Sequence, residues 1–204
     1  MWQFLKDGGP VMFLLVPTSI VGLAFIIERG LALRWRKIIP PELEKALEIC
    51  RTKEDLAMLH GICRQQPSAL GRLLMVAMEH LNWPKGENAD AIQTRARHEI
   101  AQMERGLVVL EIIVGIAPLL GLVGTINGLI SLFSGLSRTG LSDNTVVAHG
   151  ISIALNTTLS GLLIAIPALI AWSYYSKKVE TLAIEMETLC DGFLRRFYLY
   201  DEKE

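Results

Sequence analysis

Three long uncharged runs dominate the pattern of apolar and polar positions along the chain. Residues 144–176 contain no Lys, Arg, Asp or Glu in 33 consecutive positions, and residues 112–137 and 11–27 form similar runs of 26 and 17 positions. A helix needs about 20 apolar residues to cross a bilayer, and about 17 is near the lower limit. The pattern therefore predicts an all-α integral membrane protein with three transmembrane helices.

A secretory signal is the alternative interpretation of the first run, because this run lies near the N-terminus. Lys6 is the only cation before it, and Asp7 offsets that charge. Pro17 interrupts the run, and the charged pair Glu28 and Arg29 follows where a small-residue cleavage site is expected. We therefore expect an uncleaved membrane anchor.

The second and third runs each have two different sides on a helical projection at about 100° per residue. The third run gathers aliphatic residues on one side: Leu155, Leu159, Leu162 and Ile166. The second run gathers small residues within about 60° of one another: Ala117, Gly121, Gly124, Gly128, Ser131 and Gly135. Hydrocarbon penalises unpartnered polar groups, whereas small residues let helix backbones approach closely. We expect the aliphatic sides to face lipid and the small or polar sides to face protein or water. Simple packing within one three-helix subunit is the alternative for the small side.

The segment between the first two runs is helical by pattern. The proline pair at 40–41 is typical of a helix that opens with proline in its first turn, and further helices fit residues 53–63 and 68–81. Residues 83–86 read as a breaker before a helix over 90–105. That helix carries mixed charges typical of a solvated face, and it has no stop signal before Gly106. We expect it to continue into the second membrane span.

Cations are distributed unevenly along the chain. Of the 20 Lys and Arg residues, 13 lie between Glu28 and Gly106 and 5 follow Ser176. Because segments rich in Lys and Arg stay cytoplasmic, the N-terminus and the loop after the second span should lie outside. The net charge of −1 hides this asymmetry, and no nucleic-acid partner is expected.

Metal and catalytic chemistry find little support in the sequence. The three cysteines, Cys50, Cys63 and Cys190, fall in predicted cytoplasmic parts, where thiols stay reduced, so no disulfide is expected. His60 and Cys63 have a spacing that could hold a metal, but no second pair accompanies them, and packing is favoured. His149 lacks a partner carboxylate nearby in sequence except Asp143. We predict no enzyme, no cofactor and no metal site.

Two motifs resemble the ExbB/TolQ/MotA ion-channel family. They are APLLGLVGTINGLI at residues 117–130 and GISIALNTTLSGLLIAIPA at residues 150–168, and Ile27-Glu28-Arg29 with Arg34 adds to the likeness. The resemblance implies a homopentamer of three-span subunits around the membrane helices of two copies of an ExbD/TolR-like single-span protein. A membrane aspartate of that partner takes up and releases the translocated ion. The second and third spans then line the lumen, where Thr125 and Thr158 match the family's threonines and Pro118 and Pro167 its span prolines.

The resemblance also implies a function and a location. The chain is expected to be a channel or stator subunit in the bacterial inner membrane. The complex would use a proton or sodium gradient for work such as TonB-dependent uptake or envelope maintenance, with a TonB-like protein as a further partner. The alternative function is that of a structural scaffold, which would bind partner helices without passing ions. A flagellar stator subunit has four membrane helices, one more than are predicted here.

Candidate site residues follow from the motifs together with the side-chain chemistry. Hydroxyls interact with a carboxylate or a cation without adding fixed charge. The expected ion-pathway residues are Thr125, Asn156, Thr157, Thr158 and Ser160. The expected packing or lumen residues are Pro118, Gly121, Gly124, Gly128, Ala154, Gly161 and Pro167.

The source of an ionisable group and the choice of ion remain open at this point. The uncharged runs at 112–137 and 144–176 contain no carboxylate, so an ionisable group within them must come from another subunit. Glu111 at the cytoplasmic mouth is the nearest one in the chain, but plain exposure at the interface is the favoured interpretation of this residue. Many ExbB and TolQ relatives carry glutamate five positions before the threonine matched by Thr158, whereas this chain has Ile153. Neutral oxygens on the third span suit sodium, so both ions remain alternatives.

The predicted domain organisation combines the spans with the charge distribution. It is an extracytoplasmic N-terminus (1–10), a first transmembrane helix (11–27), a helical cytoplasmic domain (28–106), a second transmembrane helix (107–137), a periplasmic loop (138–147), a third transmembrane helix (148–176) and a cytoplasmic C-terminal helix (177–204).

Overall fold

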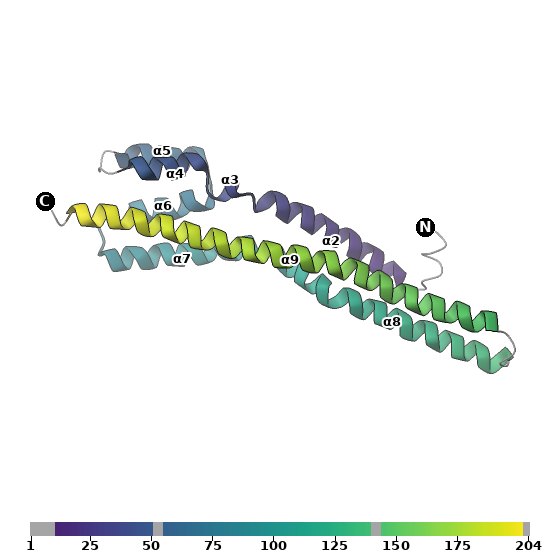
Figure 1. Cartoon of the computed structure of the whole chain (residues 1–204). Helices are drawn as coiled ribbons and strands as arrows, with labels where there is room; N and C mark the ends of the chain where they lie inside the picture. Colours follow the sequence, from purple (N-terminus) through teal and green to yellow (C-terminus); the bar gives the residue numbers. More distant parts are fainter. Residues whose placement is uncertain (1–10, 51–54, 140–143, 202–204) are drawn as a thin grey trace. The chain divides into compact units, whose positions relative to one another are not determined.

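The computed structural model describes residues 11–50, 55–139 and 144–201, with side chains except at 136–139, 144–146, 149 and 199–201. Within these ranges the chain is all α (Figure 1). The helices are α2 (Met12–Ala32), α3 (Trp35–Ile38), α4 (Pro41–Ile49), α5 (Asp55–Gln65), α6 (Ala69–Glu79), α7 (Lys85–Glu104), α8 (Leu107–Thr139) and α9 (Asn144–Asp201). The N-terminus at 1–10 and residues 140–143 of the predicted loop lie outside the described residues.

Three helices in the described part of the chain are long and apolar enough to cross a membrane. These stretches are Met12–Ala32, Leu107–Gly135 and Gly150–Tyr198. The prediction of an all-α protein with three membrane-spanning helices is therefore confirmed.

The helix α2 continues past the uncharged run at 11–27 to Ala32, because charged side chains end a hydrocarbon span without breaking a helix. Two other predictions of where helices begin or end are wrong. The helix α7 begins at Lys85 rather than at residue 90, directly after Pro84, whose fixed φ suits a helix entrance. The expected continuous helix through Gly106 is also wrong: a turn at residues 105–106 separates α7 from α8. Glycine costs about 1 kcal/mol in a helix interior relative to alanine, which favours a break there.

The longest helix is instead α9, which runs for 58 residues without interruption. It contains both the third uncharged run and the charged segment that follows residue 176. The third span and the C-terminal helix are thus parts of one continuous element.

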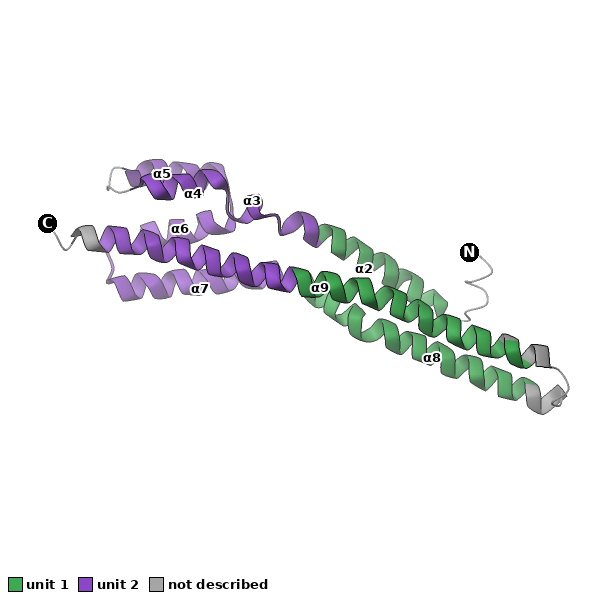
Figure 2. Ribbon diagram, viewed as in Figure 1, with its two compact units in different colours: residues 1–28, 106–174 green, residues 29–105, 175–204 purple. Residues whose placement is uncertain are grey.

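The chain divides into two compact units (Figure 2). Unit 1 comprises residues 1–28 and 106–174, and unit 2 comprises residues 29–105 and 175–204. The three uncharged runs fall in unit 1, up to the last two residues of the third, and 18 of the 20 Lys and Arg residues fall in unit 2.

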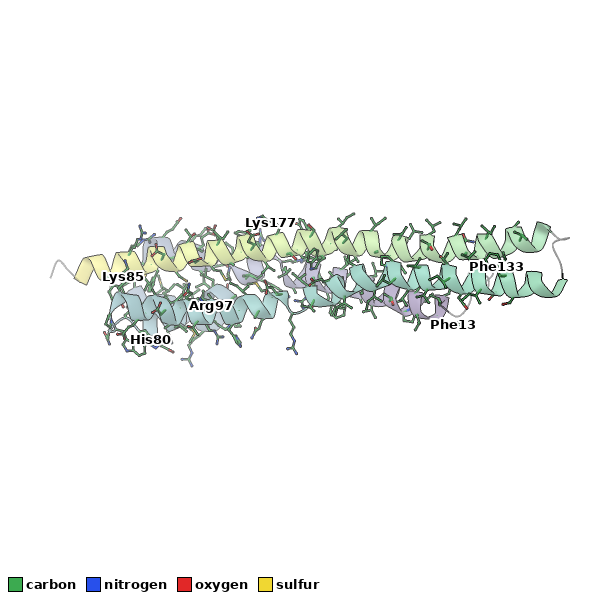
Figure 3. The ribbon with its side chains drawn as sticks, turned by 90° about the horizontal axis from the view of Figure 1, so that it is seen from below. Phe13, His80, Lys85, Arg97, Phe133 and Lys177 are labelled. Atoms are coloured by element: carbon green, nitrogen blue, oxygen red, sulfur yellow. The ribbon has the colours of Figure 1, made fainter. Side chains whose placement is uncertain are left out.

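In unit 1, the helices α8 and α9 lie side by side and antiparallel (Figure 1). Their shared core consists of Ile113, Ala117, Ala165 and Ala168. The start of α2 packs on both helices through a second cluster around Leu15, which meets Leu120 and Ile164. Large apolar side chains are exposed on the outside of the unit, including Phe13 and Phe133, which Figure 3 labels. Such a surface suits lipid or partner helices.

In unit 2, the helix α6 supplies the central apolar face. Leu70, Leu73, Leu74 and Ala77 are completely buried. The Oγ of Ser68 caps α6 by accepting a hydrogen bond from the Gly71 N–H at 3.0 Å. At the far end of α9, Tyr198 donates its hydroxyl to the carbonyl of Trp83 at 2.8 Å, and Arg196 donates to the carbonyl of Leu47 at 2.5 Å.

A carboxylate is buried inside unit 2. Glu99 on α7 is 1% exposed, although the mixed charges of this helix predicted a solvated face. Arg72 of α6 donates hydrogen bonds to both carboxylate oxygens, from Nε to Oε1 at 2.7 Å and from Nη2 to Oε2 at 2.5 Å. Arg95, one turn before Glu99, approaches Oε1 at 2.7 Å. This cluster links α6 to α7 by charge as well as by apolar contact.

Candidate ion pathway between the second and third spans

Close backbone approach between α8 and α9 depends on glycine. A Cβ on Gly161 would lie 2.5 Å from the carbonyl oxygen of Ala117, and one on Gly121 would lie 3.0 Å from Thr158 Cα. A Cβ on Gly124 would lie 2.7 Å from Thr157 Cβ. The small side of α8 therefore packs on α9 of the same chain, which is the arrangement that the intrasubunit alternative predicts.

This close approach brings two predicted pathway residues together. The hydroxyls of Thr125 on α8 and Thr158 on α9 hydrogen-bond to each other, and both residues are half-buried. Thr125 Oγ1 also reaches the carbonyl oxygen of Ala154 at 2.9 Å and that of Gly121 at 3.2 Å. Thr158 Oγ1 lies 3.4 Å from the Gly121 carbonyl oxygen. Each threonine thus bonds to the opposite helix.

The hydrogen-bond capacity of the pair exceeds what these contacts use. Each hydroxyl has one hydrogen to donate and two lone pairs to accept with. The carbonyl oxygens of Gly121 and Ala154 also contact the pair, and a carbonyl can only accept. The hydroxyl hydrogens of Thr125 and Thr158 are consequently taken up, while lone pairs remain for a donor or a cation. The pair is a neutral, half-buried acceptor site.

The other three predicted pathway residues do not join this pair. Thr157 is completely buried against Gly124, and its hydroxyl donates to the carbonyl of Ala154 at 2.8 Å. Ser160 donates back to the carbonyl of Asn156 at 2.7 Å. Asn156 and Ser160 are each two positions from Thr158, so at about 100° per residue they lie nearly opposite it around α9. The oxygens of α9 are spread around the helix rather than gathered in one cluster.

The remaining predicted packing residues have different surroundings. A Cβ on Gly128 would lie 3.4 Å from Ala154, which is buried. Pro118 is half-buried in α8 and Pro167 is exposed in α9. Each proline lacks the N–H that would bond the carbonyl four residues earlier. In a membrane such a carbonyl needs another partner, so both prolines mark points where the spans offer backbone acceptors.

Sequence patterns missed two features of this contact. The carbonyls of Gly121 and Ala154 are the main acceptors of the threonine pair, and a backbone group leaves no signal in side-chain periodicity. Leu132 is buried and fills the space beside Gly150, whereas Ser131 on the predicted small side is exposed. Glu111 is exposed, as the favoured interpretation of this residue expects.

A metal centre finds no support in the described residues. Within the part of the chain that the structure describes, no group of three His, Cys, Asp or Glu side chains could hold a metal ion. His60 is exposed while Cys63 on the same helix is buried, so the two side chains have different surroundings. Burial raises the pKa of the Cys63 thiol to about 11, which keeps it protonated.

Fold and site together define a helical integral membrane protein with neutral polar groups where two of its spans meet. The profile of the MotA/TolQ/ExbB proton channel family matches residues 65–188, more than half of the chain. The protein belongs to this family, as the motifs at 117–130 and 150–168 predict.

Individual relatives agree with this assignment. The chain is 37% identical over 176 residues to an ExbB-like 1 biopolymer transport protein of Synechocystis, covering 83% of this chain and 68% of that protein. It is 39% identical over 119 residues to biopolymer transport protein exbB1 of Vibrio cholerae, covering 58% of this chain and about half, 52%, of that protein. It is 27% identical over 215 residues to the Tol-Pal system protein TolQ of Pseudomonas aeruginosa, covering 95% and 90% of the two chains.

Proposed function

We propose that this chain is the ion-channel subunit of an energy-transducing motor in the bacterial inner membrane. In this proposal five copies surround two copies of an ExbD/TolR-like single-span protein, and the N-terminus lies outside. The complex uses an ion gradient to drive an envelope process. Relatives bear names from two such systems, biopolymer transport and Tol-Pal, and a TonB-like protein is the further partner expected for the first.

The observation that carries the proposal is the threonine pair of Thr125 and Thr158. It lies in two spans that contain no charged side chain between residues 112 and 137 or between 144 and 176. A fixed charge there would trap an ion of opposite sign, whereas neutral oxygens lower the cost of an ion without holding it. The pair is half-buried, so a group from a neighbouring helix can reach it.

A partner carboxyl group suits this acceptor pair in both of its protonation states. A protonated carboxyl donates its hydrogen to a threonine lone pair, and an ionised carboxylate accepts a hydrogen after a hydroxyl rotates. Exchange between these two arrangements needs no charged residue of this chain. The partner's aspartate would therefore carry the proton, and the threonines would stabilise it at the midpoint of the path.

Protons fit the geometry better than sodium ions. A dehydrated cation needs several oxygen ligands at once. Thr125 and Thr158 offer two hydroxyls, while Asn156 and Ser160 lie nearly opposite Thr158 around α9. We therefore propose proton coupling, with sodium coupling as the alternative that the experiment below separates.

The substitution Thr158→Val tests the proposal, because it keeps the shape of the side chain and removes the hydroxyl. A hydrogen bond to a charged group contributes about 1.5–3 kcal/mol, so ion-coupled activity should fall about tenfold or more. Thr125→Val should behave in the same way. The measurement is ion flux into vesicles that contain the complex with its partner.

Matched controls separate chemistry from folding. Thr181→Val removes an exposed hydroxyl of α9 that bonds only within its own helix, to Lys177 at 2.9 Å, and should leave flux unchanged. Leu159→Ala, on the exposed side of α9, should change ion flux little. Native mass spectrometry must find the same assembly in all variants. Full flux in Thr158→Val would overturn the assigned role of the pair.

The same vesicles identify the ion and test the rival function. Flux that persists with a proton gradient and no sodium supports proton coupling, whereas flux that follows only the sodium gradient would contradict it. A scaffold has one observation in its favour, because the threonine hydroxyls find acceptors within their own chain. Absence of flux with and without the single-span partner would favour that scaffold.

A further inference from the structure

A groove between the helices α7 and α9 lies within unit 2 and plays no part in the proposed ion path. It has a volume of about 380 Å³, which is in the range of pockets that bind ligands. One wall comes from residues 89–100 of α7 and the other from residues 183–194 of α9, which runs antiparallel to α7 (Figure 1). Each wall covers 11 helical steps, so the groove is about 16 Å long.

The floor of this groove is apolar. The residues that line it and are at most 6% exposed are Leu73, Ile92, Cys190 and Leu194. The two walls also contribute small side chains, Ala96 from α7 and Ala183 from α9, which are half-buried. Such small side chains leave a channel between the two helices, into which a ridge of side chains on a third helix can pack.

The rim of the groove carries more negative than positive charge. Its exposed carboxylates are Asp90, Glu187 and Asp191, and one exposed cation, Arg97, accompanies them. Asp191 is paired with Arg195, whose Nε lies 2.9 Å from Oδ2. Asp90 and Glu187 have no ion-pair partner among the side chains that the structure describes. The rim therefore favours a partner that brings positive charge.

We propose that this groove binds an amphipathic helix of another protein, in which a row of apolar side chains is flanked by Lys or Arg. The length of the groove matches about three helical turns, so apolar side chains spaced three or four residues apart enter it one after another. The flanking cations then lie near Asp90 and Glu187. A small organic cation would satisfy the same charge but would fill only part of this length.

The two features of the groove have different roles in this proposal. Exposed charge pairs contribute little to affinity, so contact with the apolar floor supplies most of it. The carboxylates select basic helices over acidic ones. All the residues involved belong to unit 2, and the proposal depends neither on the ion that the complex carries nor on its orientation in the membrane.

Peptide binding to the full-length protein tests the groove. The protein is placed in phosphatidylcholine nanodiscs, and the probe is a fluorescent peptide of about 15 residues with Leu along one helical face and Lys beside it. One comparison peptide has Glu in place of Lys, and another has the same composition in an order that breaks the apolar row. Fluorescence anisotropy, corrected with empty nanodiscs, should show the Lys peptide binding at least about fivefold more tightly than either.

Two substitutions with matched controls locate the binding site. Ala96→Leu fills the channel and should weaken binding of the Lys peptide about tenfold, whereas Ala101→Leu, exposed on the same helix and outside the groove, should change it less than about twofold. Glu187→Gln removes a rim charge and should weaken binding about threefold. Glu185→Gln is its control, because Glu185 lies two residues away on α9, does not line the groove and should have less effect.

Several outcomes would contradict the proposal. Equal binding of the Lys and Glu peptides would remove the role of the carboxylates, and equal binding of the reordered peptide would remove the helical row. Equal losses in Ala96→Leu and Ala101→Leu would place the peptide elsewhere. If the original protein binds no peptide and Ala96→Leu lowers the number of copies in native mass spectra, the groove is instead an interface between copies of this chain.

A second measurement protects the test against an effect of Ala96→Leu on folding. The Lys peptide should raise the unfolding temperature of the original protein and of Ala101→Leu, and should raise that of Ala96→Leu much less. If Ala96→Leu fails to fold, Glu187→Gln decides the test, because an exposed carboxylate on the rim can be neutralised without disturbing the core. Unchanged peptide affinity in Glu187→Gln would then overturn the proposal.

Discussion

At the scale of single residues, the buried charge of Glu99 has a clear energetic role. Burial is the largest single influence and raises the pKa of this carboxyl, but the hydrogen bonds and charges of Arg72 and Arg95 together more than offset it and hold the pKa below the usual value. Removal of one partner from a buried ion cluster leaves the others unpaired, which costs more than the loss of an exposed pair.

Glu99→Gln should therefore destabilise unit 2. The two arginine side chains are 38% and 36% exposed and stay partly hydrated, so we expect a loss of about 2 kcal/mol rather than the full cost of a buried charge. That corresponds to a fall of about 4–8 °C in the unfolding temperature. The three cysteines are free and buried, so their reaction with a fluorogenic thiol reagent during heating reports the unfolding of unit 2.

Glu104→Gln provides the comparison, because Glu104 is exposed at the end of the same helix. It should change the free energy of unfolding by no more than about 0.5 kcal/mol.

The pH dependence of the stabilisation by Glu99 provides an independent test. A carboxyl with a lowered folded pKa contributes stability above its unfolded pKa, and that stability is lost as pH falls through the folded value. The difference in unfolding free energy between the original protein and Glu99→Gln should therefore be largest at pH 7 and should decrease below about pH 4.5. A difference that does not change with pH would contradict the role of the carboxylate charge.

At the scale of helices, the sequence predicted which helices are present better than it predicted the residues at which they begin and end. The three spans follow from the length of the uncharged runs alone, and the lipid-side prediction for Leu155 and Leu159 agrees with their exposure. The start of α7 at Lys85 was missed because proline and glycine at residues 84 and 86 are typical of a break, whereas proline also suits the entrance of a helix. Periodicity defines a small face on α8, but it does not say which helix meets that face. The Thr125–Thr158 contact therefore needed the three-dimensional packing.

Gly161→Ala tests the tight contact between α8 and α9. The added methyl group would lie 2.5 Å from the carbonyl oxygen of Ala117, so the helix backbones must separate. Such overpacking typically costs about 1–3 kcal/mol, and the hydrogen bond between Thr125 and Thr158 should lengthen with it. Hydrogen–deuterium exchange of peptides covering α8 should become faster.

Gly115→Ala is the matched control for this substitution. Gly115 lies in the same pair of spans, and a Cβ there would meet no atom within 4 Å among the described residues. Alanine also favours a helix over glycine by about 1 kcal/mol, so exchange should stay equal or slow down. Faster exchange in both variants, or in neither, would show that close approach at Gly161 does not hold the two spans together.

At the scale of the whole molecule, the distribution of charge predicts the topology. Unit 2 contains 18 of the 20 Lys and Arg residues, and cations near the spans, such as Arg34, Lys177 and Lys178, decide which side stays in the cytoplasm. The direction of ion flow in the proposed function depends on this orientation.

Single cysteines at Glu87 and Asp143 in a cysteine-free background test the topology directly. Glu87 is exposed in α7, while Asp143 lies between the second and third uncharged runs, outside the described residues. A membrane-impermeant maleimide should label the cysteine at 143 in intact cells whose outer membrane has been made permeable. It should label the cysteine at 87 only after the inner membrane is opened, because the basic segment is held inside. Labelling at 87 from outside would reverse the orientation, and with it the direction in which ions must pass the threonine pair.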